Sequence, residues 1–272
     1  MVVTLAVLSM PFSANAADAP INAGAGTTVT VGDNYEIEMT GNGSTAVAAA
    51  QNANVTLGND AKITVDGDSA YGVQTNGENS KIEFGDGAGI EMTGNAAVGV
   101  ETSADNSLIK FGESAEIVLQ GDYNYGASVW SENSSIEFGA DAKITAVSNA
   151  VRVGGNDSQA IFGADAILTT SGDNAYTVHL GAASGSSITF DNGAVINSDG
   201  HASIGVFIER SGEVSFKDQA EIKVTGDFAY GVYLQNQYDG NVSKITFGDG
   251  AQIEAHGYNA DGIHVEAENS TA

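Results

Sequence analysis

Short runs of alternating apolar and polar residues recur along the chain from about residue 27 to its end. Alternation at period two is the pattern of half-buried β-strands, because successive side chains of a strand point to opposite faces. Three such runs fall within one stretch of about 27 residues: Ile82–Phe84, Ala88–Met92 and Val98–Val100. The pattern therefore predicts an all-β protein built from a repeated unit of three short strands.

Two landmarks keep the repeat in register. The first is an apolar residue followed by glycine or its substitute, and its nine copies are Val31-Gly32, Leu57-Gly58, Phe84-Gly85, Phe111-Gly112, Phe138-Gly139, Phe162-Gly163, Phe190-Asp191, Phe216-Lys217 and Phe247-Gly248. The second lies nine residues later and comprises Gly41, Gly67, Gly94, Gly121, Ser148, Gly172, Gly200, Gly226 and Gly257. Because this spacing is constant, we expect length variation only in the loop after the third strand, short at 154–158 and long at 235–242.

Three strands and three turns in about 27 residues can wrap once around a core, so each coil can pair only with the coils above and below it. The sequence predicts a single-stranded parallel β-helix of about nine coils, with the right-handed wind of other parallel crossovers. One core column is expected from Ile82, Ile109, Ile136, Ile161, Ile188, Val214 and Ile245, flanked by the phenylalanines. Another is expected from Ile63, Ile90, Ile117, Ile144, Ile167, Ile196, Ile222 and Ile253.

The chain is strongly acidic. It has 9 Lys and Arg against 35 Asp and Glu, a net charge of −26, which argues against nucleic acid or an anionic membrane as a partner. Apart from the apolar run at the start of the chain, no segment approaches the apolar length of a membrane helix, so we expect no membrane insertion by this chain. Cysteine is absent from the sequence, which excludes disulfides and thiolate metal sites.

Residues 1–16 have the pattern of a signal peptide. Met1–Phe12 is an apolar run, and Ala14-Asn15-Ala16 has the small-residue spacing of a signal-peptidase site. No Lys or Arg precedes the run, so we expect a signal shortened at its start, with an apolar capping strand or helix as the alternative. The β-helix region then covers 17–272. Its last residues parallel Glu78–Ile82, so we expect the chain to stop within a coil.

The repeat unit at Ser80–Val100, following a signal-like start, resembles the passenger regions of bacterial autotransporters, especially adhesins and polymorphic outer-membrane proteins. The resemblance covers about residues 27 to 272. It implies an exported protein at the cell surface, associated with the outer membrane or extracellular, with a translocator barrel in the full-length protein. It further implies an adhesive or coat role, with a surface protein or glycan of a host or neighbouring cell as the partner.

An enzyme is the main alternative, because parallel β-helices also carry polysaccharide lyases and hydrolases. Such sites need carboxylates that converge from neighbouring coils. This sequence has no Asp-Asp pair and two arginines, Arg152 and Arg210. Aspartates recur instead in turns, where capping is a sufficient role: Asp60, Asp86, Asp141, Asp165 and Asp249. We therefore predict no enzyme activity, with a polysaccharide-active enzyme or a structural spacer for an absent effector domain as the alternatives.

Neither a metal site nor a cofactor is predicted. The nonapeptide of calcium-binding rolls occurs once, in broken form, at Gly154–Asp157, so weak surface calcium stays open. The four histidines show no ligand spacing: His179, His201, His256 and His264. Two of them, His179 and His264, are expected to point into solvent from the third strand.

The third strand of each coil is the candidate contact surface. Its outward column is expected to contain Gln74, Glu101, Ser128, Arg152, His179, Phe207, Tyr233 and His264. A column at the start of the strand, where core-edge packing is expected, contains Tyr71, Val98, Tyr125, Tyr176, Ile204, Tyr230 and Asp261. Phe207 and Tyr233 are predicted to be exposed, with Trp130 further along the same side. Together they form a candidate patch for a protein or glycan, and packing of loops over them is the alternative.

Overall fold

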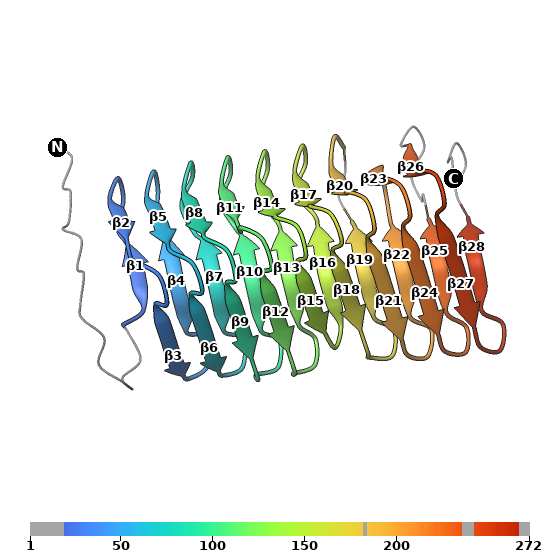
Figure 1. Cartoon of the computed structure of the whole chain (residues 1–272), viewed down its shortest axis with the longest axis horizontal. Coiled ribbons are helices and arrows are strands. Elements are labelled where there is room, and N and C mark those ends of the chain that lie inside the picture. The colour runs from blue at the N-terminus through green and yellow to red at the C-terminus, as the bar shows by residue number, and fades with distance from the viewer. Residues whose placement is uncertain (1–18, 182–183, 236–241, 267–272) are drawn as a thin grey trace.

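The computed structural model describes residues 19–181, 184–235 and 242–266. The predicted signal peptide, most of the predicted long loop at 235–242 and the end of the chain after 266 lie outside them. Every helix or strand in these ranges is a β-strand, and all pairs are parallel. Three rows of strands run along the long axis of a rod from its N-terminal to its C-terminal end (Figure 1). The prediction of an all-β parallel β-helix is confirmed, while its right-handed wind stays a prediction.

Each coil contributes one strand to each of three sheets. The first sheet contains β2 (Thr28–Thr30), β5 (Asn54–Leu57), β8 (Lys81–Phe84), β11 (Leu108–Lys110), β14 (Ser135–Phe138), β17 (Gln159–Phe162), β20 (Ser187–Phe190), β23 (Gly212–Phe216) and β26 (Ser243–Phe247). The second contains β3 (Glu36–Thr40), β6 (Lys62–Asp66), β9 (Gly89–Met92), β12 (Glu116–Leu119), β15 (Lys143–Ala146), β18 (Ile167–Thr170), β21 (Val195–Asp199), β24 (Glu221–Thr225) and β27 (Gln252–His256). The third contains β1 (Ile21–Ala23), β4 (Thr45–Ala49), β7 (Tyr71–Thr75), β10 (Val98–Thr102), β13 (Tyr125–Val129), β16 (Asn149–Val153), β19 (Tyr176–Leu180), β22 (Ile204–Ile208), β25 (Tyr230–Leu234) and β28 (Asp261–Val265).

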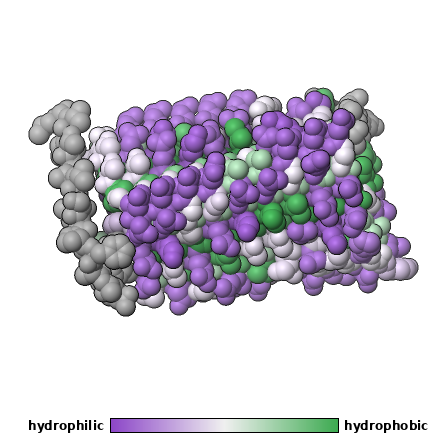
Figure 2. Space-filling model, viewed as in Figure 1, coloured by the Kyte–Doolittle hydropathy of each residue, from purple (hydrophilic) through white to green (hydrophobic). Residues whose placement is uncertain are grey.

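Neighbouring strands in a sheet are one coil apart. Val98 on β10 pairs with Tyr71 on β7, 27 positions earlier, as the repeat predicts. Hydrophilic side chains cover much of the rod in rows along its long axis, and hydrophobic residues show between these rows (Figure 2). In the described part of the chain, no helix has the length and apolar character that crossing a bilayer requires.

The core is a set of stacked columns. Phenylalanine rings of the first sheet stack almost face to face, with centroids 4.6–5.3 Å apart and planes within 9° of parallel: Phe84, Phe111, Phe138, Phe162, Phe190, Phe216 and Phe247. Two predicted column members are wrong. Ile136 pairs with Ala160, not Ile161, and Ile144 pairs with Leu168, not Ile167. Both predicted isoleucines lie between inward residues and are only half-buried.

Length variation is not confined to the loop after the third strand, contrary to prediction. Between β15 and β16 the usual second turn is reduced to Val147 and Ser148, because the pairing offset falls from 27 residues at Thr145 to 24 at Asn149. The side chain of Asn124, one coil earlier, compensates. Its Oδ1 accepts hydrogen bonds from the backbone N–H groups of both shortened-turn residues, at 3.2 and 3.1 Å.

Polar side chains stack from coil to coil at the turns. Asn42 Oδ1 accepts the backbone N–H of Asp68 at 3.0 Å, and Asp68 Oδ1 accepts that of Asn95 at 2.8 Å. At the first turn, Asp86 Oδ1 accepts the N–H of Glu113 at 2.8 Å, which confirms its predicted capping role. Many turn carboxylates thus satisfy backbone donors that successive coils would otherwise leave unpaired.

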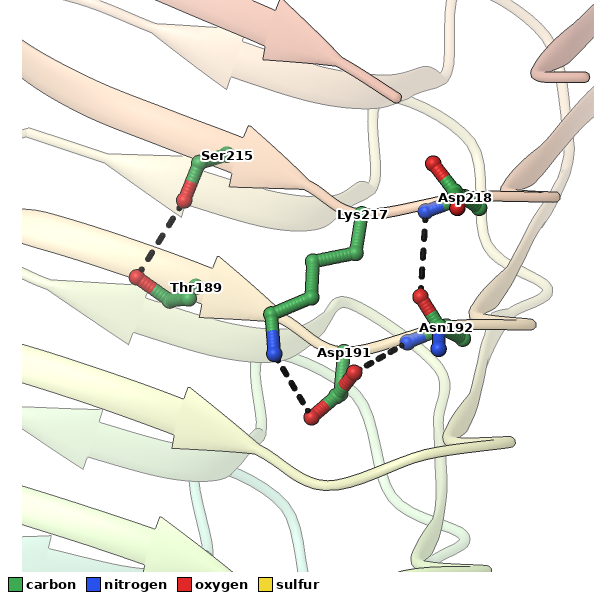
Figure 3. Close-up of polar contacts among 6 residues, drawn as sticks. All are labelled: Thr189, Asp191, Asn192, Ser215, Lys217 and Asp218. Carbon is green, nitrogen blue, oxygen red and sulfur yellow. Dashed lines mark hydrogen bonds and ion pairs between the residues drawn. The ribbon is translucent and has the colours of Figure 1, made fainter. Parts of the chain in front are cut away.

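Two coils replace the landmark glycine, by Asp191 and Lys217 (Figure 3). Lys217 Nζ lies 3.0 Å from Asp191 Oδ2, and this contact lowers the pKa of the Asp191 carboxyl. Asn192 Oδ1 accepts the N–H of Asp218 at 3.2 Å, so the turn ladder continues beside the substitution. The exposed ion pair itself contributes little to stability.

Candidate binding face

The third strand of each coil begins with a change of phase. Gly99 turns its Cα inward: a Cβ there would lie 2.6 Å from Gly126 O and 2.8 Å from Ile117 Cγ2. The next residue, Val100, is also fully buried. Because two successive residues face the core, the residue before them and the residue after them both face outward.

This change of phase brings three columns together on the outer surface of the third sheet, here called the binding face. The first column contains Tyr71, Val98, Tyr125, Asn149, Tyr176, Ile204, Tyr230 and Asp261. The second contains Gln74, Glu101, Ser128, Arg152, His179, Phe207, Tyr233 and His264. The third, two residues further on, includes Trp130, Gly154, Gly181, Glu209 and Glu266. The tyrosines are half-buried, but they belong to this face and not to the core edge.

Aromatic rings are in continuous contact along the C-terminal half of the face. Centroids of neighbouring rings lie 5.0–5.3 Å apart, and the members are Tyr176, His179, Phe207, Tyr230, Tyr233 and His264. Two predictions of exposure are wrong, because Phe207 is 7% exposed and His179 is 6% exposed. Rings one coil apart cover each other, so Phe207 and His179 point outward but are not accessible to solvent. Tyr233 is half-buried between its neighbours.

Trp130 is the exposed aromatic residue of the predicted patch, at 43%. The guanidinium carbon of Arg152 lies 3.8 Å from the centre of the indole ring, and 5.8 Å from that of Tyr125. Gly154, one coil above Trp130, leaves room for the ring, since a Cβ there would lie 3.2 Å from the indole Cε3. The structure therefore joins Trp130 to Arg152 and Tyr125. Two strands, β16 and β19, separate it from Phe207 on β22, and Tyr233 lies one strand further on.

Charged groups are interleaved with the rings. His179 Nε2 lies 3.2 Å from Glu209 Oε2, yet burial lowers the pKa of His179, an effect to which the charge of Arg152 adds and which Glu209 opposes. The Tyr233 hydroxyl donates to Glu266 Oε2 at 2.6 Å, and burial together with this carboxylate raises the tyrosine's pKa. The binding face thus combines aromatic surface with individually placed charges.

Glu101 is the buried carboxylate of this face, at 7% exposed, and accepts a hydrogen bond from Gln74 Nε2 at 3.1 Å. Burial raises its pKa, although hydrogen bonds from Gln74 and Ser103 oppose the shift. Ionised Glu101 therefore costs folding stability, and this cost disappears as pH falls below the ordinary value of 4.5. Glu101→Gln should raise the free energy of unfolding at pH 7, and the gain should shrink toward pH 4, as measured by urea denaturation.

Glu91 provides the matched control, because it accepts a hydrogen bond from Gln120 Nε2, also at 3.1 Å, but is exposed. Glu91→Gln should leave stability nearly unchanged at both pH values. An equal change in the free energy of unfolding of the two variants would mean that burial does not cause the effect of Glu101→Gln.

Among the described residues, no three His, Asp or Glu side chains are placed to hold a metal ion. A shallow hollow of about 450 Å³ lies where the face meets the third turn, and its lining is mainly polar: Gln51, Asn76, Gly77, Glu78, Ser103, Ala104 and Asp105.

No protein-family model matches this sequence, and a search of curated proteins gives no match. Among solved structures, the chain is similar to the catalytic domain of a GH87 alpha-1,3-glucanase in complex with nigerose, at 12% identity and a TM-score of 0.21, over 89% of this chain and 64% of that one. A substituted form of that catalytic domain in complex with tetrasaccharides matches at 13% identity and the same TM-score. The chain thus spans 64% of the length of these structures, and a likeness at this level carries no argument about activity.

Sequence reasoning placed Arg152 in the outward column but missed its contact with Trp130. Two signals could have found it. Arginine occurs twice in a chain of net charge −26, and Gly154 stands at the position one coil after Trp130, where a side chain would displace the indole.

Proposed function

We propose that this chain is the β-helical passenger region of an exported bacterial surface protein, which adheres to a surface protein or glycan of a host or neighbouring cell. The observation that carries the proposal is the binding face, where Trp130, Tyr233 and the rings between them lie on one rigid sheet. The autotransporter-like repeat supports the same role, and with it export, a surface location and a translocator barrel in the full-length protein.

Aromatic residues on a rigid sheet suit adhesion for an energetic reason. Binding through side chains already held by neighbouring coils costs little conformational entropy. Aromatic side chains also carry much of the binding energy at protein contacts. Stacking between coils fixes the rings on this face before a partner arrives, so the rod can present them without a lid or hinge.

The experiment uses the exposed and half-buried members of the face and leaves buried Phe207 intact. Trp130→Ser and Tyr233→Ser should each weaken adhesion of the full chain to cultured cells about tenfold, as truncation of an interface anchor does. Tyr123→Ser is the matched control, because Tyr123 is 79% exposed but lies in a turn outside the face. Circular dichroism verifies that all three variants keep their β-structure.

Adhesion that survives both substitutions, or that falls equally in Tyr123→Ser, would contradict the proposal and favour the role of a structural spacer. Surface location is checked separately, by antibody labelling of intact bacteria. Labelling only after the cells are lysed would contradict export.

A further inference from the structure

Arg152 forms no ion pair within the described residues of a very acidic protein, although its charge helps to lower the pKa of Glu209, the carboxyl that pairs with His179. The chain has 9 Lys and Arg in 272 residues, and several of the lysines form ion pairs, as Lys217 and Lys244 do. Within the described residues, the guanidinium of Arg152 forms neither an ion pair nor a hydrogen bond; its contacts are with the rings of Trp130 and Tyr125. Arg152 is partly accessible, so solvent or a ligand can reach it.

The surroundings of Arg152 are also short of hydrogen-bond partners. Buried polar atoms without a partner lie on it and on its neighbours in the adjoining strands β13, β16 and β19: Ser128 Oγ, Asn149 Oδ1, Arg152 Nε and His179 Nδ1. Two of these side chains are more than nine-tenths buried, Ser128 at 0% and His179 at 6% exposed. Buried polar groups are normally paired, so unpaired ones call for a partner such as water, an ion or a ligand.

Charge limits which anion can bind there. A net charge of −26 repels a polyanion such as nucleic acid or a long acidic peptide. An anion with one charge on an otherwise neutral body avoids most of this repulsion and still meets the guanidinium. The adjoining indole, 43% exposed, provides a flat apolar surface of the kind that packs against the C–H face of a sugar ring.

We propose that Trp130, Arg152 and Tyr125 form a binding site for a sugar acid, a glycan residue that bears a single carboxylate. The guanidinium pairs with the carboxylate through two parallel N–H donors, and the indole packs against the pyranose ring. The ring centre of the half-buried Tyr125 lies 5.8 Å from the guanidinium carbon. This assignment rests on the proposed adhesive function, because it names the ligand class of the same face.

Trp130 is the single tryptophan of the chain, so intrinsic fluorescence reports on this site directly. The probe is a disaccharide that ends in glucuronic acid, and the comparison ligand is the same disaccharide with its carboxylate reduced to an alcohol. Titration of the full chain should change the fluorescence with the acidic sugar. The neutral sugar should bind about tenfold or more weakly, as expected when a charge-assisted hydrogen bond is lost.

Arg152→Gln should remove the preference for the acidic sugar. Lys143→Gln is the matched control, because it deletes the same charge in the same coil, on an exposed residue of β15 in the second sheet. Equal binding of the two sugars, no response to either sugar, or an equal loss in both variants would overturn the assignment. Tighter binding of tetraglutamate than of the sugar acid would overturn it in favour of a peptide site.

Adhesion to cells separates this inference from the proposed function. If Trp130→Ser abolishes adhesion while neither sugar binds, the sugar-acid assignment fails and the adhesive function stands. If adhesion survives both Trp130→Ser and Tyr233→Ser, the proposed function fails, whatever the fluorescence shows.

Discussion

Phe162→Ala should lower the free energy of unfolding by about 3–5 kcal/mol, which is the usual cost of emptying a large aromatic site in a core. Phe162 is 1% exposed and stacks between Phe138 and Phe190 at 5.0 and 4.8 Å. Removal of one ring leaves a cavity and breaks two stacks, and the coils on either side cannot close the gap, because backbone hydrogen bonds set their separation. Urea denaturation followed by circular dichroism measures the loss.

Phe228 is the matched control for this substitution. It is 41% exposed in a turn, and two other coils have alanine at the equivalent position, Ala96 and Ala202. Phe228→Ala should therefore change the free energy of unfolding by less than about 1 kcal/mol. If Phe162→Ala were equally mild, the phenylalanine column would not be the main support of the rod.

Gly99→Ala should lower the free energy of unfolding by about 1–3 kcal/mol, the cost of overpacking a core. The added Cβ would lie 2.6 Å from the carbonyl oxygen of Gly126 in the next coil, and that backbone cannot move without breaking the ladder of the third sheet. Gly99→Val should be worse, since it adds two methyl groups to a Cβ that already lies 2.8 Å from Ile117 Cγ2. Thermal unfolding detects both effects.

Gly89→Ala is the contrasting substitution on β9 of the second sheet. A Cβ there meets nothing within 4 Å, and the backbone is outside the left-handed region. Alanine should be neutral or stabilising by about 0.4–1 kcal/mol, because it restricts the unfolded chain. Equal effects of Gly89→Ala and Gly99→Ala would show that stability depends on the loss of glycine flexibility and not on the close contact between residue 99 and Gly126.

The coil that contains Phe162 shows how the position of Gly99 can hold a larger residue. Thr177 occupies the equivalent position on β19, and Thr170 on β18 faces it in place of an aliphatic residue. Its hydroxyl lies 2.7 Å from Thr170 Oγ1 and donates to Asn197 O at 3.0 Å. The larger residue is thus accompanied by a polar partner on the facing strand.

The sequence by itself determined the architecture and most of the core. Period-two alternation sets which side chains of a strand face inward, and the recurrence of the two landmarks in nine coils admits few shapes other than a stacked solenoid. Identical residues at identical coil positions must then stack, which is why the phenylalanine column could be predicted. In the first two strands of a coil, local pattern and neighbouring-coil pairing agree wherever the repeat keeps its length.

Pairing between coils decided the positions where the repeat changes length. From sequence alone, the deletion of three residues could lie in any turn of its coil. The structure places it in the second turn, where Asn124 of the preceding coil accepts hydrogen bonds from the backbone N–H groups of Val147 and Ser148. Ile161 and Ile167 were misplaced for a different reason. Composition favours isoleucine in the core, but the strand register places Ala160 and Leu168 there.

Only the tertiary structure decided the binding face. Alternation along one strand predicts whether a residue points outward, but accessibility depends on the rings of the coils above and below, which bury Phe207 and His179 and leave Trp130 exposed. The contact between Trp130 and Arg152 likewise joins residues 22 positions apart in sequence. It exists because coil stacking lays one strand directly beside another, and Gly154 leaves the space in which the indole lies.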